Sequence, residues 1–482
     1  MEQEEFNVVN SKKALRAKEN RDLTKGNLFK KLIIYVVPLF LANALSLLFT
    51  TMDLFTVARF GGGNISSGAI GACSSLINLV LAFFWGLTNG ASVIVGNAKG
   101  AKDYDKCTRA IGTSVLLTIF LGVIIMILGA IFAKPLLQLL QTPDQFLDKS
   151  TLYLTIYFIG TPFNLLFNIG ASVLRALGDS KRPLVAVTVA GVINVGLNFL
   201  LVIPFKMDVM GVAIATVASQ AISMFIVFLF LMKDKKLASN FHFKYLRYNK
   251  EEAKDIIRIG LASGLQSLIF NITNVLIQVS VNGLSDAAVV GKAAGSNVEG
   301  YEYALLNAIS NGCTVATSQN YGAKDKKRVK HSLRNSIIFE LIAVTAFDGI
   351  ILALANPILR IFIAPGEATS QEATQYAIQM LMIMGLPYAL CGIAECFTGY
   401  LRGMKYSLVP TLVSLICIVG VRLIYIYAMF PLEQFHSFSG LMWTYPVSWT
   451  LCCLVYIPIS IVLSKRKFKE IDKQKQELSP AL

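Results

Sequence analysis

Long apolar stretches separated by short polar segments dominate this chain of 482 residues. Windows such as Ser114–Phe132 and Ala221–Met232 contain no charged side chain at all. A run of about 20 apolar residues matches the hydrocarbon thickness of a bilayer. In lipid, each backbone amide must find its hydrogen bond within its own segment, which favours helices. The pattern therefore predicts a bundle of membrane-spanning α-helices.

The breaks between apolar stretches define twelve candidate spans. In the first half they lie near 30–57, 66–96, 108–133, 150–175, 183–204 and 211–232. In the second half they lie near 256–281, 288–320, 332–356, 376–401, 408–430 and 437–464. The second span of each half is long enough for either two shorter helices or one strongly tilted helix.

The charged residues support this count of spans. Only 15% of the residues are charged and 55% are hydrophobic, yet the net charge is +15. Most lysines and arginines fall in alternate connecting segments, as the positive-inside rule predicts for an even number of spans. We therefore expect both termini to be cytoplasmic, and we attribute the basic charge to membrane topology and not to nucleic-acid binding.

The two halves of the chain resemble each other. Four signals recur in the same order, at an offset that grows from 222 to 229 residues. The paired segments are Asn89-Gly90 with Asn311-Gly312 followed by Gly100–Asp103 with Gly322–Asp325, Gly160 with Gly385, Leu174 with Leu401, and Gly211 with Gly440. An even number of spans per repeat makes the repeats parallel. We expect two parallel six-helix lobes around a central cleft, the plan of many transporters.

This reading divides the chain into five parts. They are a cytoplasmic N-terminal tail at 1–29, an N-terminal six-helix lobe at 30–232, a basic cytoplasmic linker at 233–255, a C-terminal six-helix lobe at 256–464 and a cytoplasmic C-terminal tail at 465–482.

Several motifs are similar to those of the multidrug and toxic compound extrusion (MATE) transporters. They are Pro38 with Asp53, Gly86–Ser92 with Gly100–Asp103, Leu174–Ser180 before Pro183, and Gly211–Thr216 with Ser219-Gln220. The resemblance covers residues 30–464. It implies export of amphipathic, often cationic compounds, driven by inward movement of H⁺ or Na⁺.

The resemblance also implies a cation-coupling cluster in the N-terminal lobe. Asp53 occupies its acidic position, and Asn194, Asn198 and Thr216 match three others. Asn194 and Asn198 are four residues apart and so share one helix face. The family often has a second acid where this chain has Asn198, so a two-acid relay is not expected here. The residues leave H⁺ and Na⁺ open as the coupling ion.

The C-terminal half departs from the family pattern. Its seventh span carries amides such as Gln266 and Asn274 but no acid, and Glu395 lies about one turn from the family's acidic position in the tenth span. Glu299 and Glu302 share a helix face and either attract cationic substrates into the cleft or lie in water at the outer end of the span. We take these five residues as weak candidates for the substrate cleft.

Three further residues attract attention within the spans. Arg422 lies mid-span and should have an acidic partner, for which Asp348 and Glu395 are the candidates. Pro38 interrupts the first span, where a proline frees a carbonyl and permits bending, so we predict that it is a hinge.

The sequence thus predicts a secondary active multidrug antiporter of a bacterial or archaeal inner membrane, acting as a monomer on small amphipathic or cationic substrates. The alternative is a flippase for lipids or lipid-linked oligosaccharides, but the candidate cleft charges are acidic. An intramembrane enzyme is disfavoured because the three histidines lie near loops and no HExxH or GxSxG motif is present. No cofactor or metal is expected beyond the coupling ion, since the eight cysteines form no CxxC pair.

Overall fold

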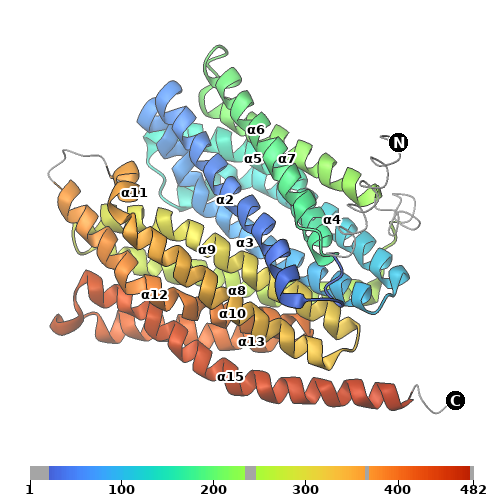
Figure 1. The fold of residues 1–482 in the computed structure, drawn as a ribbon. Coiled ribbons are helices and arrows are strands. Elements are labelled where there is room, and N and C mark those ends of the chain that lie inside the picture. Colours follow the sequence, from blue (N-terminus) through green and yellow to red (C-terminus); the bar gives the residue numbers. More distant parts are fainter. Residues whose placement is uncertain (1–20, 234–245, 364–368, 478–482) are drawn as a thin grey trace, which may run out of the picture. The chain divides into compact units, whose positions relative to one another are not determined.

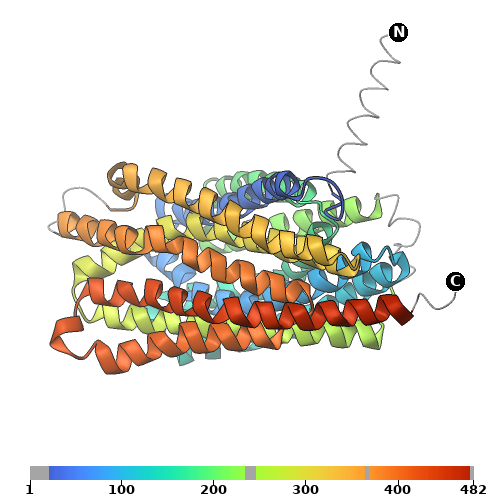
Figure 2. The same ribbon diagram turned by 60° about the horizontal axis from the view of Figure 1, so that its bottom comes forward.

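The computed structural model describes residues 21–233, 246–363 and 369–477, and these residues are almost entirely helical. The middle of the predicted linker, 234–245, lies outside the described residues. Figures 1 and 2 show the helices. The described part of the chain separates into two compact units. Unit 1 holds Val37–Gly264 with the described residues up to Asp22, and unit 2 holds Leu23–Val36 and Leu265–Leu482.

The first half of the chain forms six long helices. They are α2 (Leu28–Phe60), α3 (Gly63–Gly100), α4 (Tyr104–Leu139), α5 (Asp144–Ala176), α6 (Lys181–Val202) and α7 (Asp208–Met232). Within unit 1, α5 packs against α3, α4 and α7, and α6 packs against α7.

The second half repeats this plan. Its helices are α8 (Lys250–Asn282), α9 (Asp286–Gly322), α10 (Lys326–Ala353), α11 (Ala355–Phe362), α12 (Ser370–Gly403), α13 (Leu408–Ser414), α14 (Val421–Ile424) and α15 (Phe438–Glu477). Two π-helical turns, η2 (Leu415–Gly420) and η3 (Tyr425–Met429), join α13 and α14 into one span, and a short 3₁₀ turn, η4 (Glu433–Phe435), precedes α15. Within unit 2, α12 packs against α9, α10 and α15, as α5 does in unit 1. Figures 1 and 2 both show α10 and α12 side by side.

Eleven helices of the described chain are long and apolar enough to cross a membrane. The remaining long helix, α9, occupies the place of the predicted eighth span and carries more polar residues than the others. The prediction of an all-helical membrane protein with twelve long helices is therefore confirmed. The second span of each half is one continuous helix, α3 or α9.

The sequence repeat becomes a repeated turn in three dimensions. Asp103 accepts a hydrogen bond from the backbone N–H of Lys106 at 2.9 Å, and Asp325 accepts one from Arg328 at 2.9 Å. The preceding Lys102 and Lys324 have φ values of 59° and 56°, the left-handed conformation that ends one helix before the next begins. The same four residues thus build the same helix stop and helix N-cap in both units.

Small residues allow close helix packing in unit 1. A side chain at Gly86 would lie 2.2 Å from the carbonyl oxygen of Gly260, and one at Gly90 would lie 2.3 Å from that of Ile256. Both contacts join α3 to the first turns of α8, which belong to this unit. In unit 2, Gly312 of α9 meets the first turns of α2, where a side chain would lie 3.0 Å from Val36. Small residues spaced by four are the usual means of close approach between membrane helices.

Candidate functional site

A half-buried carboxyl lies where α2, α6 and α7 meet in unit 1. The side-chain amide of Asn198 donates to Asp53 Oδ1 at 2.5 Å, and the Thr216 hydroxyl lies 3.4 Å from Asp53 Oδ2. Asn198 also donates to Asn194 Oδ1 at 3.3 Å. The structure therefore brings together all four residues of the predicted cation-coupling cluster. Their role in coupling stays a prediction.

Local packing positions this cluster. Asn194 and Asn198 face α2 from successive turns of α6, and their side chains are 4% and 0% exposed. One turn before Asn194, the ring of Phe49 fills the place of a side chain at Gly191, which would lie 1.8 Å away. Glycine at this position lets α2 approach α6, so that Asp53, one turn after Phe49, reaches the two amides.

The cluster is chemically suited to hold one small cation. It offers a carboxyl oxygen pair, a hydroxyl and two amide oxygens, and Asn198 Oδ1 is buried without a hydrogen-bond partner. Within the described residues Asp53 forms no ion pair, so no fixed cation holds it in the ionised form. It can therefore gain and lose a positive charge, either as a proton or as a sodium ion.

The weak cleft candidates of unit 2 do not share one cavity wall. Gln266 accepts from Arg402 at 2.7 Å, and Asn274 accepts from Arg422 at 3.2 Å. The two amides of the seventh span therefore serve as acceptors for buried or half-buried arginines. Tyr388 lies 3.4 Å from the carboxyl of Glu299.

The remaining acids of unit 2 lie deeper than expected. Glu302 is only 4% exposed, so the alternative that it lies in water at the outer end of its span is wrong. Its carboxyl faces that of Asp348. Glu395 is partly buried and has Arg402 as its basic neighbour. Sequence reasoning missed Glu340, whose side chain is fully buried in α10.

Arg422 has partners other than those predicted. It donates to Ser448 at 3.4 Å as well as to Asn274, and its guanidinium lies 4.1 Å from the centre of the Tyr445 ring. The acid that faces it electrostatically is Glu299, and Asp348 and Glu395 do not pair with it in the described part of the chain. Burial of this arginine is thus compensated by an amide, a hydroxyl, a ring face and one carboxyl.

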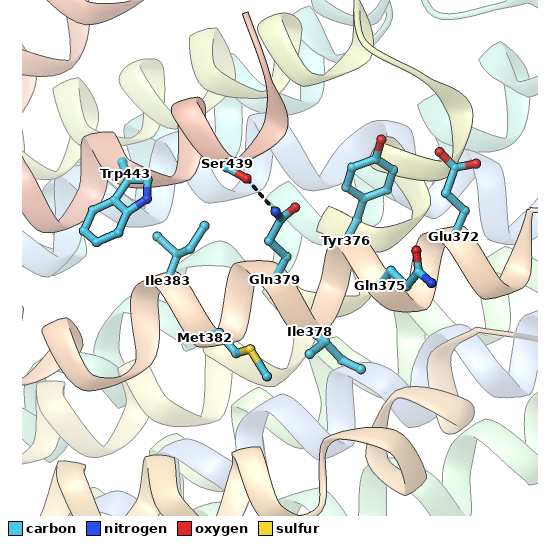
Figure 3. Close-up of a pocket in the computed structure, with 9 residues that line it drawn as sticks. All are labelled: Glu372, Gln375, Tyr376, Ile378, Gln379, Met382, Ile383, Ser439 and Trp443. Carbon is cyan, nitrogen blue, oxygen red and sulfur yellow. Dashed lines mark hydrogen bonds between the residues drawn. The ribbon is translucent and has the colours of Figure 1, made fainter. Parts of the chain in front are cut away.

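An open groove of about 590 Å³ lies between the first turns of α12 and α15 in unit 2. Figure 3 shows its walls, in which Gln379 donates to Ser439 at 2.5 Å. Glu372, Tyr376, Met382 and Trp443 give it one carboxyl and a largely apolar, aromatic lining. The buried acids of α9 and α10 do not line this groove.

Pro38 lies inside α2, which stays helical on both sides of it. The division between the two units falls between Val36 and Val37, directly before this proline. The first turns of α2 pack with unit 2 and the rest with unit 1. The proline is thus located where a bend of α2 would move one unit's segment against the other's, and the hinge stays a prediction.

Comparison with known proteins shows the family. The MatE family model matches residues 38–200 and 262–428, which is more than half of the chain and one match per repeat. The probable multidrug resistance protein YoeA of Bacillus subtilis is 28% identical over 408 residues, covering 83% of this chain and 86% of that protein. The multidrug export protein MepA of Staphylococcus saprophyticus is 22% identical over 447 residues, covering 92% and 95%.

Solved structures show the same fold. A crystal structure of MATE in complex with MaL6 superposes with a TM-score of 0.83 at 18% identity, over 94% of this chain and 99% of that chain. An outward-facing multidrug resistance MATE transporter gives a TM-score of 0.82 at 18% identity, over 94% and 98%. With the family match across both repeats, these likenesses identify the chain as a multi-pass membrane transporter of the MATE family.

Proposed function

We propose that this protein exports amphipathic, often cationic compounds in exchange for inward movement of H⁺ or Na⁺, with Asp53 as the coupling carboxyl. The observation that carries the proposal is the Asp53 cluster, in which one half-buried acid contacts Asn198 and Thr216 but no basic residue. The curated relatives, named as multidrug resistance and export proteins, support the substrate class. They give no support to the flippase alternative.

The cluster suggests how ion binding drives the cycle. With Asp53 ionised, the amide of Asn198 and the hydroxyl of Thr216 donate to it; with a cation bound, the carboxyl is neutral and these donors lose their charged acceptor. A ligand drives a conformational change only by binding two states unequally. We infer that the contacts from α6 and α7 to α2 differ between the loaded and empty states, and that Pro38 lets α2 bend as they change.

The groove of Figure 3 has the chemistry that such substrates need. Its aromatic and apolar lining suits the flat part of an amphipathic molecule, and Glu372 suits a positive charge. We infer that the protein acts as a monomer in the inner or plasma membrane of a bacterium or archaeon, with both termini in the cytoplasm, as its lysines and arginines indicate. Apart from H⁺ or Na⁺, the proposal needs no cofactor.

Transport measurements in proteoliposomes test the proposal. The purified protein is exposed to separate and opposed H⁺ and Na⁺ gradients, and accumulation of a fluorescent cationic dye is followed. We expect one of the two gradients to drive accumulation, and Asp53→Asn to reduce it to the level of protein-free liposomes. Asp148→Asn is the matched control, because Asp148 is 93% exposed in the same unit. If Asp53→Asn moved the dye against its gradient as well as the parent protein, coupling through Asp53 would be refuted.

A further inference from the structure

Three acidic side chains lie buried together inside unit 2, apart from both the Asp53 cluster and the groove. Glu302 belongs to α9, and Glu340 and Asp348 belong to α10; their exposed fractions are 4%, 0% and 2%. α12 packs against both of these helices. An ionised carboxylate in such surroundings is strongly disfavoured unless a cation or several hydrogen-bond donors face it.

Neither compensation is present around these acids. Within the described residues, both carboxyl oxygens of Glu340, both of Asp348 and Oε1 of Glu302 receive no hydrogen bond from any donor group. No described ion pair involves them either. The basic side chains nearby in the fold are engaged elsewhere, Arg402 with Gln266, Arg422 with Asn274 and Lys292 with Gln278.

Glu302 and Asp348 are left with each other. Their carboxyl groups lie within hydrogen-bonding reach across the α9–α10 contact. A carboxylate only accepts, so this contact is a hydrogen bond only when one partner carries a proton. Two carboxyls so close cannot both ionise, which is the behaviour of shared-proton carboxyl pairs in general. Glu340 is the electrostatic neighbour of Asp348 and points its unpartnered oxygens into the same region.

The packing around Glu340 leaves room for its carboxyl group. A side chain on Gly392 of α12 would lie 1.7 Å from Glu340 Oε1 and 2.2 Å from Glu340 Cδ. The glycine therefore lets α12 close over a carboxyl group that would otherwise clash. An acid accommodated in this way, with no partner that stabilises its charge, does not improve the packing of the unit.

The repeat shows that the fold does not require acids at these positions. At the offset of 222 that relates the two repeated turns, Glu302, Glu340 and Asp348 correspond to Val80, Thr118 and Met126. Val80 packs against the apolar core of unit 1, and the Thr118 hydroxyl is satisfied by the carbonyl of Ser114 at 2.8 Å. Unit 1 thus builds the same layer from apolar or satisfied side chains. The acids of unit 2 are an addition to a scaffold that is complete without them.

We propose that Glu302, Asp348 and Glu340 form a second, buried proton-binding site, in which one proton is shared between Glu302 and Asp348 and a further proton resides on Glu340. Glu299 adjoins Glu302 and Glu395 adjoins Glu340; both are partly exposed and serve as the carboxyls through which protons enter and leave. The titratable groups facing the site are Glu299 and Cys313 on α9 and Tyr388, Cys391, Glu395 and Cys396 on α12. The site is distinct from Asp53 and does not depend on the antiport proposed above.

Infrared spectroscopy of the purified protein in lipid tests this assignment directly. A protonated carboxyl has a C=O stretching band that an ionised carboxylate lacks and that shifts in D₂O. We expect the difference spectra of the parent against Glu302→Gln and against Asp348→Asn to show loss of such a band at neutral pH. Both substitutions are close in shape to the original side chain. Glu433→Gln, at an exposed position, should remove only ionised carboxylate bands.

The unaltered protein supplies a test that needs no folded variant. Its protonated-carboxyl band should exchange in D₂O and disappear as the pH is raised, because the proton is exchangeable. Glu299→Gln should slow that exchange. If Glu302→Gln and Asp348→Asn removed only ionised carboxylate bands, the shared proton would be refuted. If the band neither exchanged nor titrated, the pair would be a sealed structural contact, and if sodium alone abolished it at constant pH, the site would be a metal-ion site.

The same spectra separate this inference from the role of Asp53. In Asp53→Asn the band assigned to Glu302 and Asp348 should persist, whatever happens to dye transport. Loss of coupling in Asp53→Asn together with an absent band in the parent would support the antiport and overturn the second site. Normal transport in Asp53→Asn with the band present would do the opposite.

Discussion

In unit 1, the helices α2, α6 and α7 surround an acid, Asp53; in unit 2, the equivalent helices surround an arginine. Arg422 lies 228 residues after Asn194, and its partners Asn274 and Tyr445 lie 221 and 229 residues after Asp53 and Thr216. These offsets are close to those of the sequence repeat. The two clusters therefore occupy corresponding places in the two units but carry opposite charges.

The surroundings of the two charges differ as much as their signs. Arg422 is held by an amide, a hydroxyl and an aromatic ring, with Glu299 as a compensating acid. Asp53 has polar neighbours but no basic one. A compensated buried charge is costly to change, whereas an uncompensated acid can change its charge by binding a cation. The comparison teaches that one repeat supplies an adjustable charge and the other a fixed one.

Stability measurements on the two charges are the strongest way to break this comparison. We expect Arg422→Leu to lower the free energy of unfolding by about 3 kcal/mol, because it leaves Glu299 and Asn274 buried without their donor. Asp53→Asn should change it by less than about 1 kcal/mol, since the amide keeps the shape and leaves no charge unpaired. Unfolding in mixed micelles of increasing SDS content measures both.

A second substitution checks the reason for this loss. Glu299→Gln in the Arg422→Leu background should restore part of the stability, because it removes the charge left without compensation. Equal losses in Arg422→Leu and Asp53→Asn would mean that both charges are structural, and the contrast between the units would be lost.

Helix docking gives the next contrast, at Gly90 and its counterpart Gly312. We expect Gly90→Ala to cost about 2 kcal/mol, because the new methyl group would lie 2.3 Å from a backbone carbonyl of α8 that cannot turn aside. Gly312→Ala should cost less than about 1 kcal/mol, since it meets the movable side chain of Val36 at 3.0 Å. The same unfolding assay ranks the two, and a reversed order would contradict the packing described for α3 and α9.

The sequence predicted the helices of both units and the repeat that relates them. Apolar length is a local property, so even the polar helix α9 was located, from its position in the repeat. The residues alone placed Asn194 and Asn198 on one helix face, and the family resemblance added Asp53 and Thr216. The structure brings these four together, which spacing along separate helices could not have shown.

The polar contacts of unit 2 were not predictable in the same way. Glu302 and Asp348 are 46 residues apart on different helices, and the rotation of each helix about its axis decides whether they meet. Hydropathy does not fix that rotation. Glu340 could have been noticed as an acid within the ninth span. Its burial depends on Gly392, which sequence reasoning had no cause to connect with it. Arg422 was expected to pair with an acid of another helix, but an amide and a hydroxyl receive its hydrogen bonds.

The smallest predicted effect tests where the two units should not differ. Asp103 and Asp325 cap α4 and α10 with the same 2.9 Å hydrogen bond, after residues of nearly the same positive φ. Replacing either N-cap by alanine removes that bond, so we expect Asp103→Ala and Asp325→Ala each to cost about 1 kcal/mol. The corresponding asparagine substitutions should cost only a few tenths, because asparagine also caps helices. Unfolding in SDS-containing micelles measures all four. Unequal losses would show that the units differ in their scaffold as well as in their charges, so that the opposite signs of Asp53 and Arg422 could no longer be assigned to function on a common frame.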